Sequence, residues 1–241
     1  MSKELFFRLW NDNDLREYML GFAYPNRKSA KWYDYKDGSA AIINNYTALI
    51  NERALVYESP VYFALRFRRY NLVEKFIDQT DSLAIIWAAK YDLVWLDRLC
   101  KVSREAANQA LRKLILINDT DPALELIDRN MADNNALKLA ILSTSVLRVT
   151  LAEALADNNR LNHSMIKYVA VNKNDDDMVE FLAADGCEFT ELELDDAIYR
   201  GRTRTIHAML LTGARPSITV LRWARNNLDS DVVEILDDLV D

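Results

Sequence analysis

The hydrophobic positions of this chain follow a helical rhythm. In residues 72–77, apolar side chains occupy the first, second, fifth and sixth positions, which lie on one face of an α-helix. Residues 232–236 show a similar stripe near the C-terminus, with apolar side chains in the first, second, fourth and fifth positions. With 5 Gly and 4 Pro in 241 residues, the chain has too few turn residues for a β-sandwich or β-barrel. The pattern therefore predicts an all-α protein.

A longer repeat organises these helices. Its best copies begin at Ala170, Ala197 and Ala224, which are 27 residues apart, and each alanine is followed nine residues later by a branched apolar residue. We call the first residue of each copy the anchor. Further anchors are predicted at Ala64, near Trp87, near Leu114 and at Ala140. One helix pair is too short to bury its apolar stripe alone, so the repeat predicts an α-solenoid of stacked antiparallel helix pairs.

Three short stretches carry a resemblance to a known family. Ser59-Pro60-Val61-Tyr62 stands where an ankyrin repeat has Thr-Pro-Leu-His, Gly201 lies at the inter-helix turn, and Gly213-Ala214 follows the outer helix. The chain thus resembles a divergent ankyrin-repeat protein. Its anchor spacings of 23 to 30 residues fall below the roughly 33 residues of an ordinary ankyrin repeat. The resemblance implies an ankyrin-like α-solenoid whose β-finger turns are truncated or absent.

The repeat divides the chain into two parts. Residues 1–58 are expected to form N-terminal capping helices with a basic and aromatic loop at 25–38, and residues 59–241 the ankyrin-like repeat array. The last helix, 230–240, is rich in acidic residues and is expected to cap the array. Both parts are predicted to belong to one continuous solenoid.

Charge is distributed unevenly along the chain. The net charge is −7, but residues 1–120 carry 18 Lys and Arg against 15 Asp and Glu, whereas residues 121–241 carry 12 against 22. Residues 175–196 contain ten acids and no Lys or Arg. Such a stretch is either a solvated face or a docking surface for a basic partner. The candidate acidic surface consists of Asp175, Asp176, Asp177, Glu188, Glu191, Glu193, Asp195 and Asp196.

Enzymatic chemistry finds little support in the sequence. His163 and His207 are the only histidines, and neither Cys100 nor Cys187 belongs to a Cys-x-x-Cys pair. Residues 172–177 lack the glycine and glutamate that an EF-hand loop requires. We therefore predict no catalytic residue, no metal site and no cofactor. No apolar run reaches about eighteen residues, which predicts no membrane span and, with so few cysteines, a cytoplasmic location, the host cytoplasm if the protein is viral.

Binding residues are predicted in three places. Exposed aromatics beside cations are typical of interface hot spots, which favours the loop residues Arg27, Lys28, Lys31, Trp32, Tyr33, Tyr35 and Lys36. Arginines follow two anchors at corresponding turns, namely Arg66, Arg68, Arg69, Arg200, Arg202 and Arg204. Near the anchors, where an ankyrin-like fold has its concave groove, stand Phe63, Tyr199 and Trp223. Solvated turn charges and aromatics folded back on the stack are the alternative explanations.

These features predict a non-enzymatic module that binds, and inhibits or sequesters, one cytosolic protein partner. Small ankyrin-like chains of this kind resemble accessory proteins by which viruses and bacteriophages act on a host factor. The alternative is an acidic nucleic-acid mimic or a nucleic-acid-associated regulator. Direct nucleic-acid binding is disfavoured by the net negative charge. The sequence leaves the identity of the partner and the oligomeric state open.

Overall fold

The computed structural model describes residues 38–43, 50, 55, 57–228 and 230–240. The chain divides into two compact units, Met1–Pro60 and Val61–Asp241. In the first unit, helix α3 spans Gly38–Ile43, and the Ser39 hydroxyl donates a hydrogen bond to the Glu58 carbonyl over 2.9 Å. The predicted loop residues from Arg27 to Lys36 lie outside the described residues.

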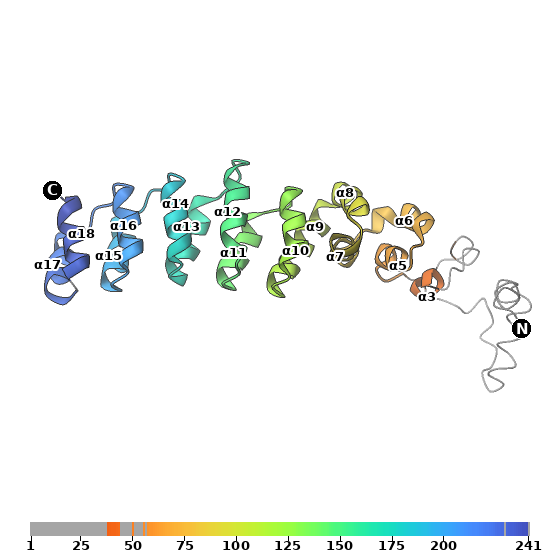
Figure 1. Ribbon diagram of the computed structural model, residues 1–241, viewed down its shortest axis with the longest axis horizontal. Helices are drawn as coiled ribbons and strands as arrows, with labels where there is room; N and C mark the ends of the chain where they lie inside the picture. The colour runs from red at the N-terminus through yellow and green to blue at the C-terminus, as the bar shows by residue number, and fades with distance from the viewer. Residues whose placement is uncertain (1–37, 44–49, 51–54, 56, 229, 241) are drawn as a thin grey trace, which may run out of the picture. The chain divides into compact units, whose positions relative to one another are not determined.

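All regular structure in the described residues is helical, which confirms the all-α prediction. From α5 onward, the helices alternate between an inner and an outer row (Figure 1). The inner helices are α5 (Pro60–Arg66), α7 (Ser82–Tyr91), α9 (Arg104–Leu116), α11 (Asn134–Leu142), α13 (His163–Lys173), α15 (Glu191–Tyr199) and α17 (Ile218–Asn227). The outer helices are α6 (Tyr70–Phe76, with the 3-10 turn η2 at Ile77–Gln79), α8 (Leu93–Val102), α10 (Thr120–Asp128), α12 (Arg148–Ala156), α14 (Asp176–Ala184), α16 (Thr203–Leu211) and α18 (Ser230–Val240).

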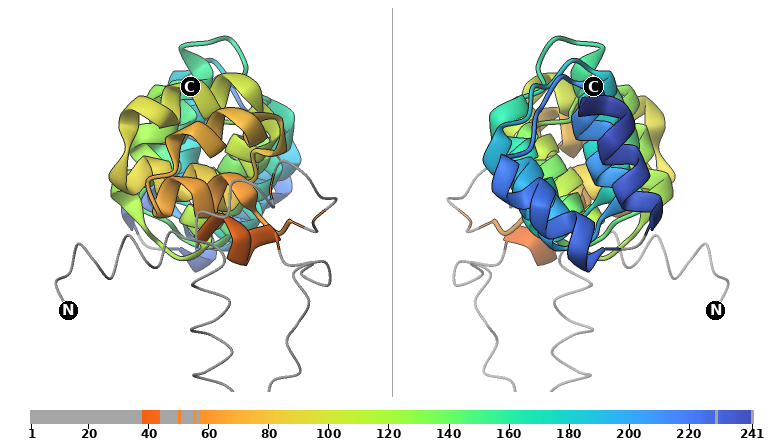
Figure 2. Two further views of the ribbon diagram at one scale, coloured as in Figure 1. Left: turned by 90° about the vertical axis from the view of Figure 1, so that its right-hand side faces the viewer. Right: turned by 90° about the vertical axis from the view of Figure 1, so that its left-hand side faces the viewer.

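The helices of the second unit pack in a way compatible with a helical solenoid. Each inner helix from α7 to α17 contacts the outer helix that follows it, and α7, α9, α11 and α13 contact one another in succession. Seen along the stack in Figure 2, the helix pairs lie behind one another. Between α13 and α15 this changes, because the outer helices α14 and α16 make the close contact and the inner helices do not pack closely.

The inter-helix turns share one geometry even where glycine is missing. The residue four positions after the anchor has a positive φ, at +54° for Asn118, +55° for Thr144, +57° for Asn174 and +64° for Gly201. In each turn the next residue donates its N–H to the anchor carbonyl, as Asp175 does to Ala170 over 3.0 Å. Asparagine tolerates the left-handed conformation better than other non-glycine residues. The turn is therefore retained in central repeats that lack glycine.

The second anchor is displaced by one residue from its predicted position near Trp87. Ala88 is fully buried, whereas Trp87 is half-buried and its ring lies 5.3 Å from that of Tyr91. Helix α7 ends at Tyr91, and Asp92 caps α8 by accepting a hydrogen bond from the Trp95 N–H. With a one-residue connection, this turn has no left-handed residue, since φ of Asp92 is −154°. Positions counted from the anchor in the other repeats therefore apply to this repeat only when Ala88, and not Trp87, is taken as its anchor.

Both cysteines are free thiols inside the stack. Cys100 is 5% and Cys187 is 4% exposed. Burial raises the pKa of the Cys100 thiol to about 11 and also raises the pKa of Cys187. A higher pKa leaves less of the reactive thiolate at neutral or mildly alkaline pH.

We expect both thiols to react with a disulfide reagent at pH 8 at least about 100-fold more slowly in the folded protein than in urea, because thiolate population and access both fall. The measurement is the time course of release of the coloured thiolate, and the urea-unfolded chain should yield two equivalents. Complete labelling of the folded chain within seconds would contradict the buried positions.

Candidate functional site

The turn that follows α13 holds an ionic cluster between two repeats. The guanidinium of Arg202 forms an ion pair with the Asp176 carboxylate and donates a hydrogen bond to the Asn174 side-chain oxygen over 3.0 Å. The Thr205 hydroxyl, fully buried, donates to the same Asp176 carboxylate over 2.5 Å. The Arg202 side chain is only 11% exposed. These contacts join the first turn of α14 to the first turn of α16.

Two further arginines complete this cluster. Arg148 lies 2.8 Å from the Asp175 carboxylate and 2.7 Å from the Asp177 carboxylate. Arg204 lies 3.1 Å from Asp177 and 2.6 Å from Glu180. The side chains surround an open depression of about 380 Å³, which is lined by both acids and cations. Two of the predicted turn arginines, Arg202 and Arg204, therefore meet part of the predicted acidic surface here, and opposite charges neutralise each other.

The other predicted acids are divided between paired and exposed positions. Glu193 lies 3.1 Å from the Lys167 ammonium, and Asp196 lies 3.0 Å from the Arg200 guanidinium. Asp195 accepts a hydrogen bond from the Ser217 N–H. The two acids that remain exposed, with no ion pair in the described part of the chain, are Glu188 and Glu191. The candidate acidic surface is thus far less negative than its sequence suggests.

The arginines of the first repeat are placed differently. Arg66 is exposed and donates a hydrogen bond to the Tyr62 hydroxyl over 2.7 Å, and Arg68 is exposed as well. Arg69 is half-buried, and its Nε has no hydrogen-bond partner. No acid pairs with these three arginines among the described residues. Their positive charge is therefore available to an acidic partner, in contrast to Arg200, Arg202 and Arg204.

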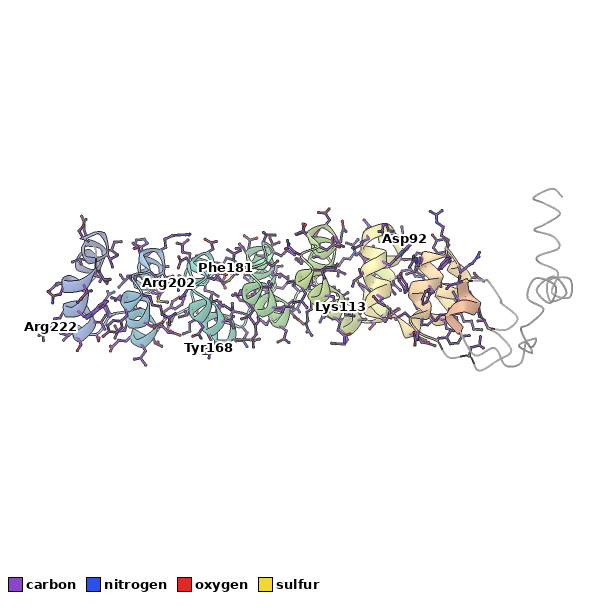
Figure 3. The ribbon with its side chains drawn as sticks, turned by 90° about the horizontal axis from the view of Figure 1, so that it is seen from below. Asp92, Lys113, Tyr168, Phe181, Arg202 and Arg222 are labelled. Carbon is purple, nitrogen blue, oxygen red and sulfur yellow. The ribbon has the colours of Figure 1, made fainter. Side chains whose placement is uncertain are left out.

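The inner helices open into a cleft at the junction of α13 and α15. Tyr168 on α13 is 70% exposed, and Leu192 on α15 is 78% exposed. They line a cleft of about 210 Å³ together with Val171, Asn172, Glu193 and Asp196. In Figure 3, Tyr168 and Arg222 lie along one side of the stack and Asp92 lies on the opposite side. The cleft thus occurs where the inner helices separate.

Two predicted groove aromatics are brought together between α15 and α17. The ring of Tyr199 lies 4.8 Å from the ring of Trp223 in a T-shaped arrangement. Tyr199 is half-exposed, and Trp223 is partly buried. Edge-to-face packing fixes the orientation of both rings. The third groove residue, Phe63, is half-buried against Tyr62 at the other end of the array.

Tyr168 and Leu192 are functional candidates that the sequence analysis missed. Both lie outside the buried stripe of their helices, two residues before Ala170 and five before Ala197. The sequence feature that could have identified them is a bulky apolar residue at a position that the helical period directs towards solvent. Exposed apolar side chains in a cleft provide anchor points for a binding partner.

Other kinds of site find no support within the described residues. They contain no group of three or more His, Cys, Asp and Glu that could hold a metal ion. His163 pairs with Asp185 over 2.7 Å at the surface. No described helix has the length and apolar character to cross a membrane. No protein-family model, curated protein or solved structure matches this chain. Its fold and surface place it in the class of all-helical, solenoid-like proteins.

Proposed function

We propose that the protein is a non-enzymatic module that binds a protein partner through its inner-helix face. The observation that carries this proposal is the cleft between α13 and α15, where Tyr168 and Leu192 are 70% and 78% exposed. Side chains this large gain free energy when a partner removes them from water, roughly 1.5 to 3 kcal/mol each when burial is complete. The helices fix the backbone of both residues before binding, which limits the entropic cost of binding.

The chemistry around the cleft selects a partner segment with a bulky apolar residue next to basic residues. The cleft has a volume of about 210 Å³, and Glu188 and Glu191 lie exposed on the loop before α15 and at its first residue. A Lys or Arg beside the inserted residue would meet these carboxylates. Binding at this face would inhibit or sequester the partner by covering the segment that the partner uses elsewhere.

We further propose that the stack is a divergent ankyrin-like solenoid with shortened repeats, as small viral and phage accessory proteins have. The left-handed inter-helix turns and the regular anchor spacing support this proposal. The alternative, an acidic nucleic-acid mimic, is less well supported, because Asp175, Asp176 and Asp177 are paired with arginines.

The proposal is tested by affinity capture from a lysate, followed by mass spectrometry. We expect the parent chain to retain a stoichiometric protein, and the double variant Tyr168→Ala, Leu192→Ala to retain at least about 10-fold less, since each lost anchor costs on the order of 1 kcal/mol or more. Leu211→Ala is the matched control, because Leu211 is 66% exposed on outer helix α16.

Equal recovery by the parent and the double variant would contradict binding at the cleft. Addition of duplex DNA distinguishes cleft binding from nucleic-acid mimicry. If the protein mimics nucleic acid, DNA should compete for the partner and displace it, whereas a partner bound at the cleft should stay bound. Displacement would favour the nucleic-acid mimic.

A further inference from the structure

A row of exposed apolar side chains follows the inter-helix turns of the first four repeats, whose anchors are Ala64, Ala88, Leu114 and Ala140. We call this row the apolar edge. Its members are between 38% and 77% exposed. They are Phe67, Tyr70, Tyr91, Leu93, Val94, Leu116, Ile117, Leu142 and Val146.

The apolar edge is a repeated feature of the fold. Phe67, Tyr91 and Ile117 each stand three residues after their anchor. Position six holds Tyr70 and Val146, and after the shorter turn at Asp92 the first two residues of α8, Leu93 and Val94, are exposed as well. The turns that follow Ala64, Leu114 and Ala140 are closed by the same pair of backbone hydrogen bonds, so these offsets fall on the same side of the stack.

The apolar edge ends after the fourth repeat. In the fifth and sixth repeats the same two offsets hold polar or charged residues, and their turns carry the ionic cluster. These residues are Lys173, Asp176, Arg200 and Thr203. The turn can therefore be built with polar residues at these positions. The apolar residues of the first four repeats are not needed for the turn itself. Apart from Tyr199, which is 50% exposed two residues after Ala197, the exposed apolar side chains at these offsets are confined to the first four repeats, and such a patch indicates an interface.

The size of the apolar edge matches one side of a stable interface. At these exposures, nine large side chains leave on the order of 1,000 Å² of accessible surface. The largest apolar patch on a typical monomer is about 300–600 Å², and a stable interface buries about 800 Å² on each partner. Covering this row with one partner would therefore suffice for a stable complex.

We propose that the partner is a second copy of this chain, bound through the same edge with the two chains antiparallel. The edge side chains recur once in each repeat. A second copy of the chain carries the same side chains at the same spacing, so each one can meet a counterpart. A twofold axis then places the first repeat against the fourth and the second against the third. Val94 of one copy faces Ile117 of the other.

The charges permit this arrangement. Near the middle of the apolar edge, Lys90 is paired with Asp119, and the Tyr70 hydroxyl lies 3.4 Å from the Asp92 carboxylate. The centre of the interface therefore carries little unpaired charge.

The residues changed in the test of this proposal are distinct from those of the cleft. The cleft is lined by residues of α13 and α15, and neither Val94 nor Ile117 belongs to it. The two proposals can therefore fail independently.

The first test measures the molar mass of the full chain by light scattering and by sedimentation at about 50 µM, where a standard-size interface should be occupied. We expect twice the chain mass of 27.8 kDa for the parent and 27.8 kDa for Val94→Glu, Ile117→Glu. Leu211→Glu, which puts one carboxylate at an exposed site outside the apolar edge, should stay dimeric. A circular dichroism melt shows that each variant is folded.

A monomeric parent chain would overturn the proposal and leave the apolar edge to a different protein. A parent and a double glutamate variant that are both dimeric would overturn it as well. The orientation is tested by mixing Val94→Cys with Ile117→Cys chains under mild oxidation. Antiparallel copies give disulfides between the two different chains, whereas disulfides between identical chains would show a parallel contact and overturn the arrangement.

Discussion

Replacing Leu114 with alanine should lower the free energy of unfolding by about 3 kcal/mol, because the lost apolar contacts and the remaining cavity both destabilise the folded chain. Leu114 is fully buried on α9, a helix that contacts α7, α10 and α11. The helix that carries this side chain therefore packs against three neighbouring helices. Urea denaturation followed by circular dichroism measures the change.

Leu211→Ala provides the control for this substitution. Leu211 is 66% exposed, so its truncation should change the free energy of unfolding by less than about 0.5 kcal/mol. Similar losses in both variants would mean that Leu114 does not lie in the core of the stack.

Replacing Asp176 with alanine should destabilise the chain by about 2 kcal/mol. The substitution removes the partner of the Arg202 guanidinium and leaves the buried Thr205 hydroxyl without its acceptor. Loss of one member of a buried pair costs about 3–5 kcal/mol, and the 34% exposure of the Asp176 side chain reduces that figure. Thermal melts of the variant and the parent measure the difference.

The matched control for Asp176 is Glu153→Ala on α12. Glu153 is exposed, and no ion pair holds it in the described residues, so its removal should leave the melting temperature nearly unchanged. A double variant, Asp176→Ala with Arg202→Met, should recover part of the loss because no buried cation is then left unpaired. An equal or larger loss in the double variant would contradict the pairing.

The helical stack could be predicted because its signal is local and repeated. Anchors at Ala140, Ala170, Ala197 and Ala224 are each at most 2% exposed, as expected for inner-helix contacts. The left-handed turns at Asn118 and Asn174 could also have been predicted, since asparagine is the usual substitute for glycine there. The shift from Trp87 to Ala88 could not, because the one-residue connection to α8 replaces the turn on which the offsets depend.

The binding surfaces were harder to predict, because they depend on contacts between repeats. Arg202 and Asp176 are 26 residues apart in the sequence but adjacent across the stack. Counting charges along the sequence therefore predicted an acidic surface and basic turns as separate features, although their residues form ion pairs with each other across the stack. The cleft at Tyr168 depends on the separation of α13 from α15, which repeat spacing does not reveal.

The identical turn geometry also bears on how this gene can change length. Asn174 and Gly201 occupy the same place in turns that are 27 residues apart, and both adopt the left-handed conformation. Loss of the codons for residues 175–201 would join Asn174 directly to Arg202, whose N–H already bonds to the anchor of its own turn. The shortened chain would keep its reading frame, its turn and a complete outer helix. Duplication of the same segment would lengthen the stack equally simply, so recombination can vary the distance between the apolar edge and α18.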